Sequence, residues 1–158
     1  MGIKDCSMAN KNILVPIDGS ESAFAALKQA TILANSLESK LTIISIVEEN
    51  PFVNADFYYF GADAKTMKAY FDEACLNAKH ALTEAEKICA NQSVSEFETK
   101  IIKAEVSAKN IVKVAEELDV SLIIIGSHGR KGIQKLTLGS VAEEVLKFSL
   151  LPVLIVKQ

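Results

Sequence analysis

The sequence predicts a doubly wound α/β fold, in which parallel strands form one sheet with helices on both of its faces. Five short apolar runs alternate along the chain with four segments whose apolar residues recur at helical spacing. The runs are nearly continuous in apolar residues, as expected of parallel strands that are buried on both faces. Strict alternation of strand and helix favours a single sheet with right-handed crossovers.

The predicted strands are short and rich in β-branched residues, which favour extended backbone. The first ends in a turn signal, Asp18-Gly19-Ser20, and the third is the weakest, with Ile101 and Ile102 as its apolar centre. We expect strands over residues 12–17, 41–47, 97–104, 121–125 and 153–156.

Four apolar stripes at helical spacing fill the gaps between these strands. The second stripe is the longest, since it runs from Met67 to Ile88 in alternating steps of four and three. Ser107 is expected to cap the third helix. Ser140 and Glu143 match the capping box Ser-x-x-Glu at the start of the fourth. The stripes predict helices that include residues 23–37, 67–88, 111–118 and 141–148.

Length and composition exclude several classes of function. The 158 residues suit one domain with a full core, over residues 11–158, after a flexible tail over residues 1–10. A net charge of −3 without a Lys/Arg cluster argues against a nucleic-acid partner. No apolar run approaches the roughly 20 residues of a membrane-spanning helix, so no membrane partner is expected.

Cysteine usage favours a reducing compartment. The three cysteines are odd in number, and Cys75 and Cys89 lie in one predicted helix. Fourteen residues separate them, or about 21 Å along the axis, which exceeds the reach of a disulfide. The N-terminal residues lack the apolar core of a secretory signal, so a cytoplasmic location is expected. With only His80 and His128 available, no zinc ligand set can be assembled.

A glycine-rich segment follows the fourth predicted strand and precedes the fourth predicted helix. Glycine lets backbone approach a ligand closely, and exposed amides at a helix start present N–H donors to a phosphate. Arg130 and Lys131 add positive charge within the segment, for which phosphate proximity is favoured over a merely solvated basic loop, more strongly for Arg130. The segment contains four of the seven glycines, Gly126, Gly129, Gly132 and Gly139.

A sheet of this kind binds its ligand at the carboxyl ends of the strands, beside the point where the winding reverses. The loops after the first and fourth strands carry Asp18 and Gly126, and they face each other if these strands are neighbours. Asp18 can accept hydrogen bonds from ribose hydroxyls or help to hold a Mg²⁺ that rides on phosphates. Alternatively it only caps the first helix, because Asp18 and Glu21 match a capping pattern. Both interpretations remain open at this stage.

Two common nucleotide motifs are absent from the sequence. It contains no Gly-x-x-x-x-Gly-Lys-Ser/Thr, which excludes a P-loop NTPase. It contains no Gly-x-Gly-x-x-Gly after the first strand, which argues against a dinucleotide site.

The glycine spacing resembles the signature of the nucleotide-binding universal stress proteins. Gly126-x-x-Gly129 is followed after nine residues by Gly139-Ser140, which matches Gly-2x-Gly-9x-Gly-Ser/Thr. The opening Ile-Leu-Val-Pro-Ile-Asp-Gly-Ser is similar to the family's first strand. The ending Ser-Val-Ala-Glu-Glu-Val-Leu-Lys, with Pro-Val-Leu-Ile-Val-Lys after it, is similar to its last helix and strand. The resemblance extends over residues 11–157.

This resemblance implies a Rossmann-like, three-layer α/β fold of the adenine nucleotide alpha hydrolase-like type, with five parallel strands and four helices. It implies a single universal stress protein domain over residues 11–158 and a homodimer paired through the last strand, Val153–Val156. A complete signature places the chain with the ATP-binding members, with a role in stress response or regulation. AMP or ADP is an alternative ligand, and Mg²⁺ is possible with Asp18 as its candidate ligand.

The resemblance also assigns binding residues, because each family contact can be carried to a matching position. Pro16 and Asp18 match the end of the first strand, which contacts the ribose and adenosine. Ile46 matches the second-strand backbone that contacts adenine, and Ser140 can both cap a helix and donate its hydroxyl to a phosphate. The implied phosphate-binding residues are Gly126, Ser127, Gly129, Arg130, Gly132, Gly139, Ser140 and Val141.

Catalysis is not expected from these residues. His128 lies in the loop and could act as a base, although a solvent-facing loop histidine is the favoured interpretation, and His80 is expected on a helix surface. No nucleophile and base are paired by spacing, so binding with slow or no turnover is preferred over a slow ATPase or another ATP-using enzyme.

An aromatic segment over residues 48–63 supports a third possibility, an ATP-independent chaperone-like dimer. The segment is long for a connection in such a fold, and such connections often form lids or partner surfaces. Alternatively its aromatics pack on the second helix near Tyr70 and Phe71. The aromatics are Phe52, Phe57, Tyr58, Tyr59 and Phe60.

Overall fold

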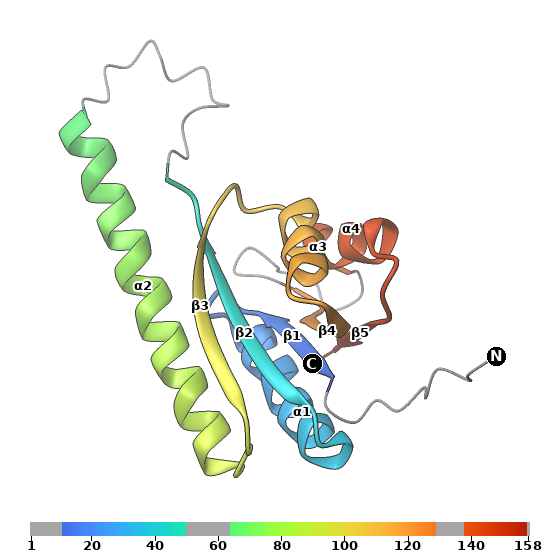
Figure 1. Cartoon of the computed structure of the whole chain (residues 1–158). Helices are drawn as coiled ribbons and strands as arrows, with labels where there is room; N and C mark the ends of the chain where they lie inside the picture. Colours follow the sequence, from blue (N-terminus) through green and yellow to red (C-terminus); the bar gives the residue numbers. More distant parts are fainter. Residues whose placement is uncertain (1–10, 50–63, 129–137, 158) are drawn as a thin grey trace.

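The structure, a computed structural model, describes residues 11–49, 64–128 and 138–157. In this part of the chain five parallel strands form one sheet in the order β3-β2-β1-β4-β5, with four helices around it (Figure 1). The elements are β1 (Asn12–Pro16), α1 (Glu21–Leu37), β2 (Lys40–Val47), α2 (Ala64–Asn91), β3 (Phe97–Lys103), α3 (Ala108–Glu117), β4 (Val120–Gly126), α4 (Ser140–Phe148) and β5 (Val153–Val156).

The predicted doubly wound fold is therefore confirmed, and so is the expected alternation of strand and helix. Each predicted strand agrees with an observed strand to within a residue at either end. The largest difference is in α2, which extends three residues beyond the predicted stripe at each end. Ser107 caps α3 as expected, because its Oγ accepts a hydrogen bond from the backbone N of Asn110 at 3.3 Å.

Each face of the sheet is covered by two helices. Ile13 and Val15 of β1 pack in one buried cluster with residues of α1 and α2, whereas Leu14 packs in a second cluster with residues of α3 and α4. Alternation along a strand sends successive side chains to opposite faces. All three side chains are at most 1% exposed. This two-sided burial explains why the strands are continuously apolar.

The winding of the chain reverses between β1 and β4. β1 pairs with β4 in parallel, with Ile13 beside Leu122 and Leu14 beside Ile123. The two strands were expected to be neighbours, and this order confirms it. Their carboxyl ends lie together, with α1 beginning after one and α4 following the other.

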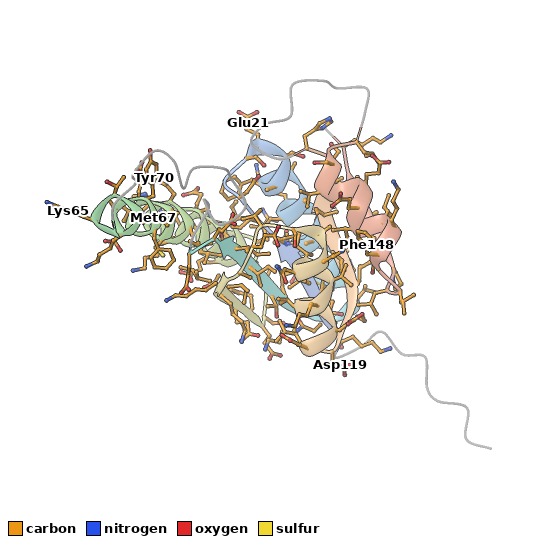
Figure 2. The ribbon with its side chains drawn as sticks, turned by 90° about the horizontal axis from the view of Figure 1, so that it is seen from above. Glu21, Lys65, Met67, Tyr70, Asp119 and Phe148 are labelled. Carbon is orange, nitrogen blue, oxygen red and sulfur yellow. The ribbon has the colours of Figure 1, made fainter. Side chains whose placement is uncertain are left out.

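The helix α2 is much longer than the strands it covers. Its 28 residues span about 42 Å, against roughly 23 Å for the seven residues of β3. No residue from 65 to 77 is buried, and burial begins at Ala78. In Figure 2 the labelled residues Lys65, Met67 and Tyr70 lie at the end of α2 that projects from the body of the molecule.

Two predictions about residues of α2 are confirmed. Cys75 and Cys89 lie in this one helix and are free thiols, and burial raises the pKa of Cys89 to about 11, with the nearby Glu86 adding to the effect. His80 is exposed. The five aromatic residues between positions 50 and 63 lie outside the described residues, so their packing near Tyr70 and Phe71 stays a prediction. Phe71 itself lies beneath the Lys103 ammonium, 5.2 Å from the ring centroid.

A polar cluster joins β2 to the edge strand β3. The carboxylate of Glu98 lies 2.9 Å from Lys40 Nζ and 3.6 Å from Lys100 Nζ, and its Oε1 is 3.3 Å from Thr42 Oγ1. The hydrogen bond from Lys40 is the main cause that lowers the pKa of Glu98 below its ordinary value of 4.5. Charged residues on an edge strand also oppose pairing with other chains.

We predict that the Glu98 cluster stabilises the fold above the ordinary carboxyl pKa and loses this effect in acid. Because the folded pKa of Glu98 is below the unfolded one, its contribution is complete above about pH 4.5 and disappears as the pH falls. Urea unfolding of wild type and Glu98→Gln should therefore differ at pH 7 and converge toward pH 3. Glu96→Gln is the control, since Glu96 is exposed and has no ion pair among the described residues. A gap that widens toward pH 3 would contradict the prediction.

Candidate functional site

The turn between β1 and α1 brings Asp18 to the carboxyl edge of the sheet. Gly19 has a φ of 81°, a left-handed conformation that favours glycine. Ser20 is the N-cap of α1, and its Oγ accepts from the backbone N of Ala23 at 3.2 Å. Asp18 Oδ1 accepts instead from the backbone N of Ser20 at 2.9 Å. The interpretation of Asp18 as the helix cap is therefore wrong, because its carboxylate shapes the turn before the cap.

The end of β4 lies directly against the first turn of α1. A Cβ added to Gly126 would lie 2.5 Å from Ser22 Oγ, 2.6 Å from the Ser22 carbonyl oxygen and 2.7 Å from its carbonyl carbon. Two of these three atoms belong to the backbone and cannot swing away. Glycine is thus required at position 126 for packing. The loop motif alone does not indicate this reason for the glycine.

Ser127 connects the end of β4 to two other elements. Its backbone N donates to Val156 O of β5 at 2.9 Å, and its carbonyl oxygen accepts from the backbone N of Gly139 at 2.6 Å. The residue is only 2% exposed. Ser127 therefore fixes the position of the start of α4 relative to the edge strand.

His128 lies between the first turns of α1 and α4. Its backbone N donates to Ser22 Oγ at 3.2 Å, and its Nδ1 is 2.9 Å from Ser127 Oγ. The residue is half-buried, and its Nε2 is buried without a hydrogen-bond partner among the described residues. The expectation of a solvent-facing histidine is therefore wrong, because Ser22 holds the backbone of His128 and Ser127 Oγ contacts its ring.

The helix α4 begins one residue earlier than its sequence motif predicts. Gly139 is the N-cap, with the extended backbone of a cap (φ −61°, ψ 152°), and Ser140 is already the first helical residue. The predicted capping box of Ser140 and Glu143 is therefore wrong, and Glu143 pairs with Lys147 at 3.2 Å instead. Among the described residues, no side chain caps the start of α4. The first N–H groups of a helix, together with its dipole, are the groups that favour an anion.

The structure brings the described candidate residues to the same edge of the sheet. Pro16 and Asp18 lie at the end of β1 and beyond it, and Ile46 is next to the last residue of β2. Ile46 is half-buried and packs on the cluster of the α3 and α4 face. At the end of β4 and the start of α4 lie Gly126, Ser127, Gly139, Ser140 and Val141.

The other candidates, Gly129, Arg130 and Gly132, lie outside the described residues, as does Lys131. The described part of the edge has an acidic side, because Asp18 and Glu21 are both exposed there. Figure 2 shows Glu21 at the start of α1. Asp18 and Glu21 would repel an anion. The positive charge that attracts an anion must therefore come from other residues of the chain or from a bound cation.

A metal held by protein alone does not fit this edge. Among the described residues no three His, Cys, Asp or Glu side chains are grouped closely enough to hold a metal ion. Asp18 offers a single carboxylate. Mg²⁺ commonly binds through one or two carboxylates together with substrate phosphates, so Asp18 fits that mode only in the presence of a phosphate ligand.

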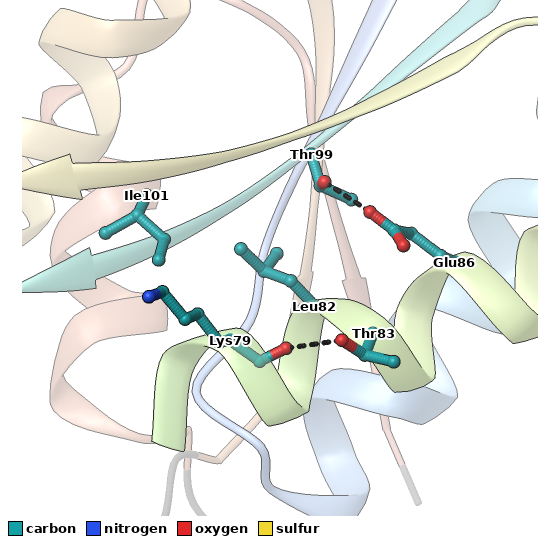
Figure 3. A pocket seen from close by; sticks show the side chains of 6 residues that line it. All are labelled: Lys79, Leu82, Thr83, Glu86, Thr99 and Ile101. Atoms are coloured by element: carbon teal, nitrogen blue, oxygen red, sulfur yellow. Dashed lines mark hydrogen bonds between the residues drawn. The ribbon is translucent and has the colours of Figure 1, made fainter. Parts of the chain in front are cut away.

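A groove between α2 and β3 lies away from this edge (Figure 3). Leu82 and Ile101 form its apolar floor. Thr99 Oγ1 donates to Glu86 Oε1 at 2.7 Å, and Thr83 Oγ1 donates to the Lys79 carbonyl oxygen at 2.9 Å. The Thr99, Glu86 and Thr83 side chains of the groove are thus already bonded to protein groups.

The nine elements and this edge define an α/β protein in which the start of α4 lies beside the switch point of the sheet. The model of the Universal stress protein family matches residues 9–157. The chain is 31% identical to universal stress protein MJ0577 of Methanocaldococcus jannaschii, over 96% of this chain and 98% of the relative. It therefore belongs to the universal stress protein family. No helix in the described residues has the length and apolar character to span a bilayer.

Solved structures of similar fold include three informative ones. UspA of Lactobacillus plantarum has a TM-score of 0.79 at 22% identity, with 94% of this chain and 99% of that chain covered. A universal stress protein in complex with cAMP has a TM-score of 0.65 at 24% identity, with 94% and 98% covered. The universal stress protein of Archaeoglobus fulgidus in complex with dAMP has a TM-score of 0.66 at 20% identity, with 95% and 99% covered.

We predict that Gly126→Ala destabilises the protein by about 1–3 kcal/mol, because the added methyl must displace backbone of α1. Chemical denaturation of the two proteins measures this loss. The control is the same substitution in a Ser22→Ala background. Removing Ser22 Oγ leaves the Ser22 carbonyl group in place, so most of the loss should persist. Complete recovery in the double variant would show that only the hydroxyl obstructs the site.

Proposed function

We propose that this protein binds an adenine nucleotide, preferably ATP, at the carboxyl ends of β1 and β4. The observation that carries the proposal is the start of α4, whose N-cap Gly139 provides no side-chain acceptor beside the polar residues Ser127 and His128. Such a helix start favours a phosphate. Family members bound to cAMP and dAMP support an adenine nucleotide as the ligand. AMP and ADP are alternatives to ATP.

In this proposal the ends of β1 and β2 bind the nucleoside, and the glycine-rich residues between β4 and α4 bind the phosphates. Pro16, Asp18 and Ile46 contact the ribose and adenine, and a Mg²⁺ on the phosphates would use Asp18. The glycine-rich half holds the phosphates, with the exposed Ser140 adding its hydroxyl. The phosphate-binding residues proposed are Gly126, Ser127, Gly129, Arg130, Gly132, Gly139, Ser140 and Val141.

The proposed role is nucleotide-dependent regulation in a stress response, in the cytoplasm. Slow ATP hydrolysis is the alternative function, and ADP release from the purified protein would distinguish it from binding alone. A chaperone-like role independent of ATP is the other alternative. It would appear as suppression of client aggregation to the same extent with and without ATP.

We further propose that the protein is a homodimer joined through β5. Among the described strands β5 pairs only with β4, so its other edge is open. Four exposed leucine and phenylalanine side chains lie in β5 itself or in the α4 and loop residues just before it. An exposed strand edge beside apolar side chains is a surface that native proteins usually cover. The four residues are Leu146, Phe148, Leu150 and Leu154.

We predict that Ser140→Asp weakens ATP binding at least tenfold without lowering the stability of the free protein. An aspartate at the first turn of α4 satisfies the helix dipole, which favours the helix, but it repels a phosphate. Isothermal titration calorimetry gives the affinity, and thermal unfolding without ligand gives the stability. Ser140→Ala is the matched control and should bind within a few-fold of wild type. Equal ATP affinity in Ser140→Asp would contradict the proposed phosphate position.

We predict that Leu154→Lys converts the dimer to a monomer while α4 and the sheet stay folded. Leu154 is 38% exposed, so a lysine there costs the free chain little, whereas it places a charge in the paired edge. Sedimentation velocity measures the assembly and circular dichroism the fold. Leu76→Lys is the control, because Leu76 is 52% exposed on α2, which packs on β2 and β3 at the other end of the sheet from β5. A wild-type monomer at micromolar concentration would refute the dimer.

A further inference from the structure

Among the described residues, His128 Nε2 is the one buried side-chain polar atom without a hydrogen-bond partner. Buried polar atoms almost always have a partner, because an unsatisfied one forfeits its interaction with water. The atom belongs to a residue at the candidate site, directly after Ser127. Its missing partner is therefore a reason to look for a ligand group at this position.

Two contacts hold this residue in place, and a third ties its neighbour Ser127 to the start of α4. The backbone N of His128 donates to Ser22 Oγ at 3.2 Å, which ties it to the first turn of α1. Its Nδ1 is 2.9 Å from Ser127 Oγ. Ser127 is in turn bonded through its carbonyl oxygen to the backbone N of Gly139, the N-cap of α4. His128 thus lies between the starts of two helices, where the dipoles favour negative charge.

The contact with Ser127 determines what Nε2 can offer. The Ser127 side chain is buried, and the only acceptor within reach of its hydroxyl among the described residues is His128 Nδ1. If the hydroxyl donates to Nδ1, the proton of the neutral ring is on Nε2. In a charged ring both nitrogens carry protons. In this tautomer, which gives the buried Ser127 hydroxyl an acceptor, and in the charged ring alike, Nε2 is a donor that requires an acceptor.

We infer that His128 Nε2 donates a hydrogen bond to a phosphate oxygen of the bound nucleotide. A phosphate oxygen is a strong anionic acceptor, and it suits a donor placed between two helix starts. The side chain therefore recognises the phosphate and not the adenosine. The inference rests on the proposed nucleotide binding and adds a specificity-determining side chain to it, at a histidine that the sequence favoured as a solvent-facing loop residue.

Two substitutions separate the nitrogens of the ring. The amide of glutamine reaches the position of Nε2, whereas the shorter amide of asparagine reaches only that of Nδ1. Calorimetric titration of wild type, His128→Gln and His128→Asn with ATP and with adenosine tests the inference. We expect His128→Asn to weaken ATP binding about tenfold or more, as for a lost bond to a charged group. Adenosine affinity should stay within twofold in both variants, and His128→Gln should keep ATP binding close to wild type.

Each other result overturns the inference in a recognisable way. If His128→Asn weakens ATP and adenosine equally and lowers the melting temperature without ligand, the histidine is only a structural tie between α1 and α4. If wild type binds ATP and His128→Asn binds it equally well, the proposed nucleotide site stands and the role of His128 falls. If wild type binds neither ATP nor adenosine, both the proposed function and the inference are wrong.

Discussion

The close approach of β4 to α1 is the constraint on which the candidate site depends. With no side chain at Gly126, the backbone of Ser22 can lie against the end of the strand. That contact brings Ser22 Oγ within hydrogen-bonding distance of the His128 backbone. Ser127, which lies between Gly126 and His128 in the chain, bonds to Val156 of β5 and to Gly139 at the start of α4. Two helices and two strands thus meet through three consecutive residues. A disturbance at any one of them would move the others, because close-packed contacts of this kind have little room to adjust.

Much of the fold could be predicted from the sequence, since burial on both faces leaves a strong pattern. Ile13, Leu14 and Val15 are all apolar because alternate side chains enter different cores, and this continuous run identifies a parallel strand. The pattern fails at helix ends, where one residue decides the cap. Ser20 caps α1 where Asp18 was a candidate, and Gly139 caps α4 in place of Ser140. Several polar residues in a row can each satisfy a capping motif, and only the backbone conformation selects among them.

The candidate site, like the fold, could be predicted from the sequence only in part. The sequence places Asp18 and Gly126 after neighbouring strands, and the structure confirms that these strands pair. It does not indicate that Gly126 is needed to accommodate Ser22, because the two residues are far apart in the chain. Nor does it indicate that His128 is drawn inward, since a histidine in a glycine-rich loop is usually exposed. Both effects arise from contacts between α1 and the end of β4, which a motif read along one segment does not contain.

The unequal burial of α2 has a consequence for local unfolding of the molecule. From Ala78 onward the helix has side chains buried in the core, whereas none of residues 65–77 is buried. A helical segment of that length is marginal by itself in water. Its amides can therefore exchange with solvent through openings that leave the sheet intact, at a lower free energy than global unfolding. The thirteen residues from 65 to 77 thus form a unit whose local stability can change without altering the geometry at the end of β4.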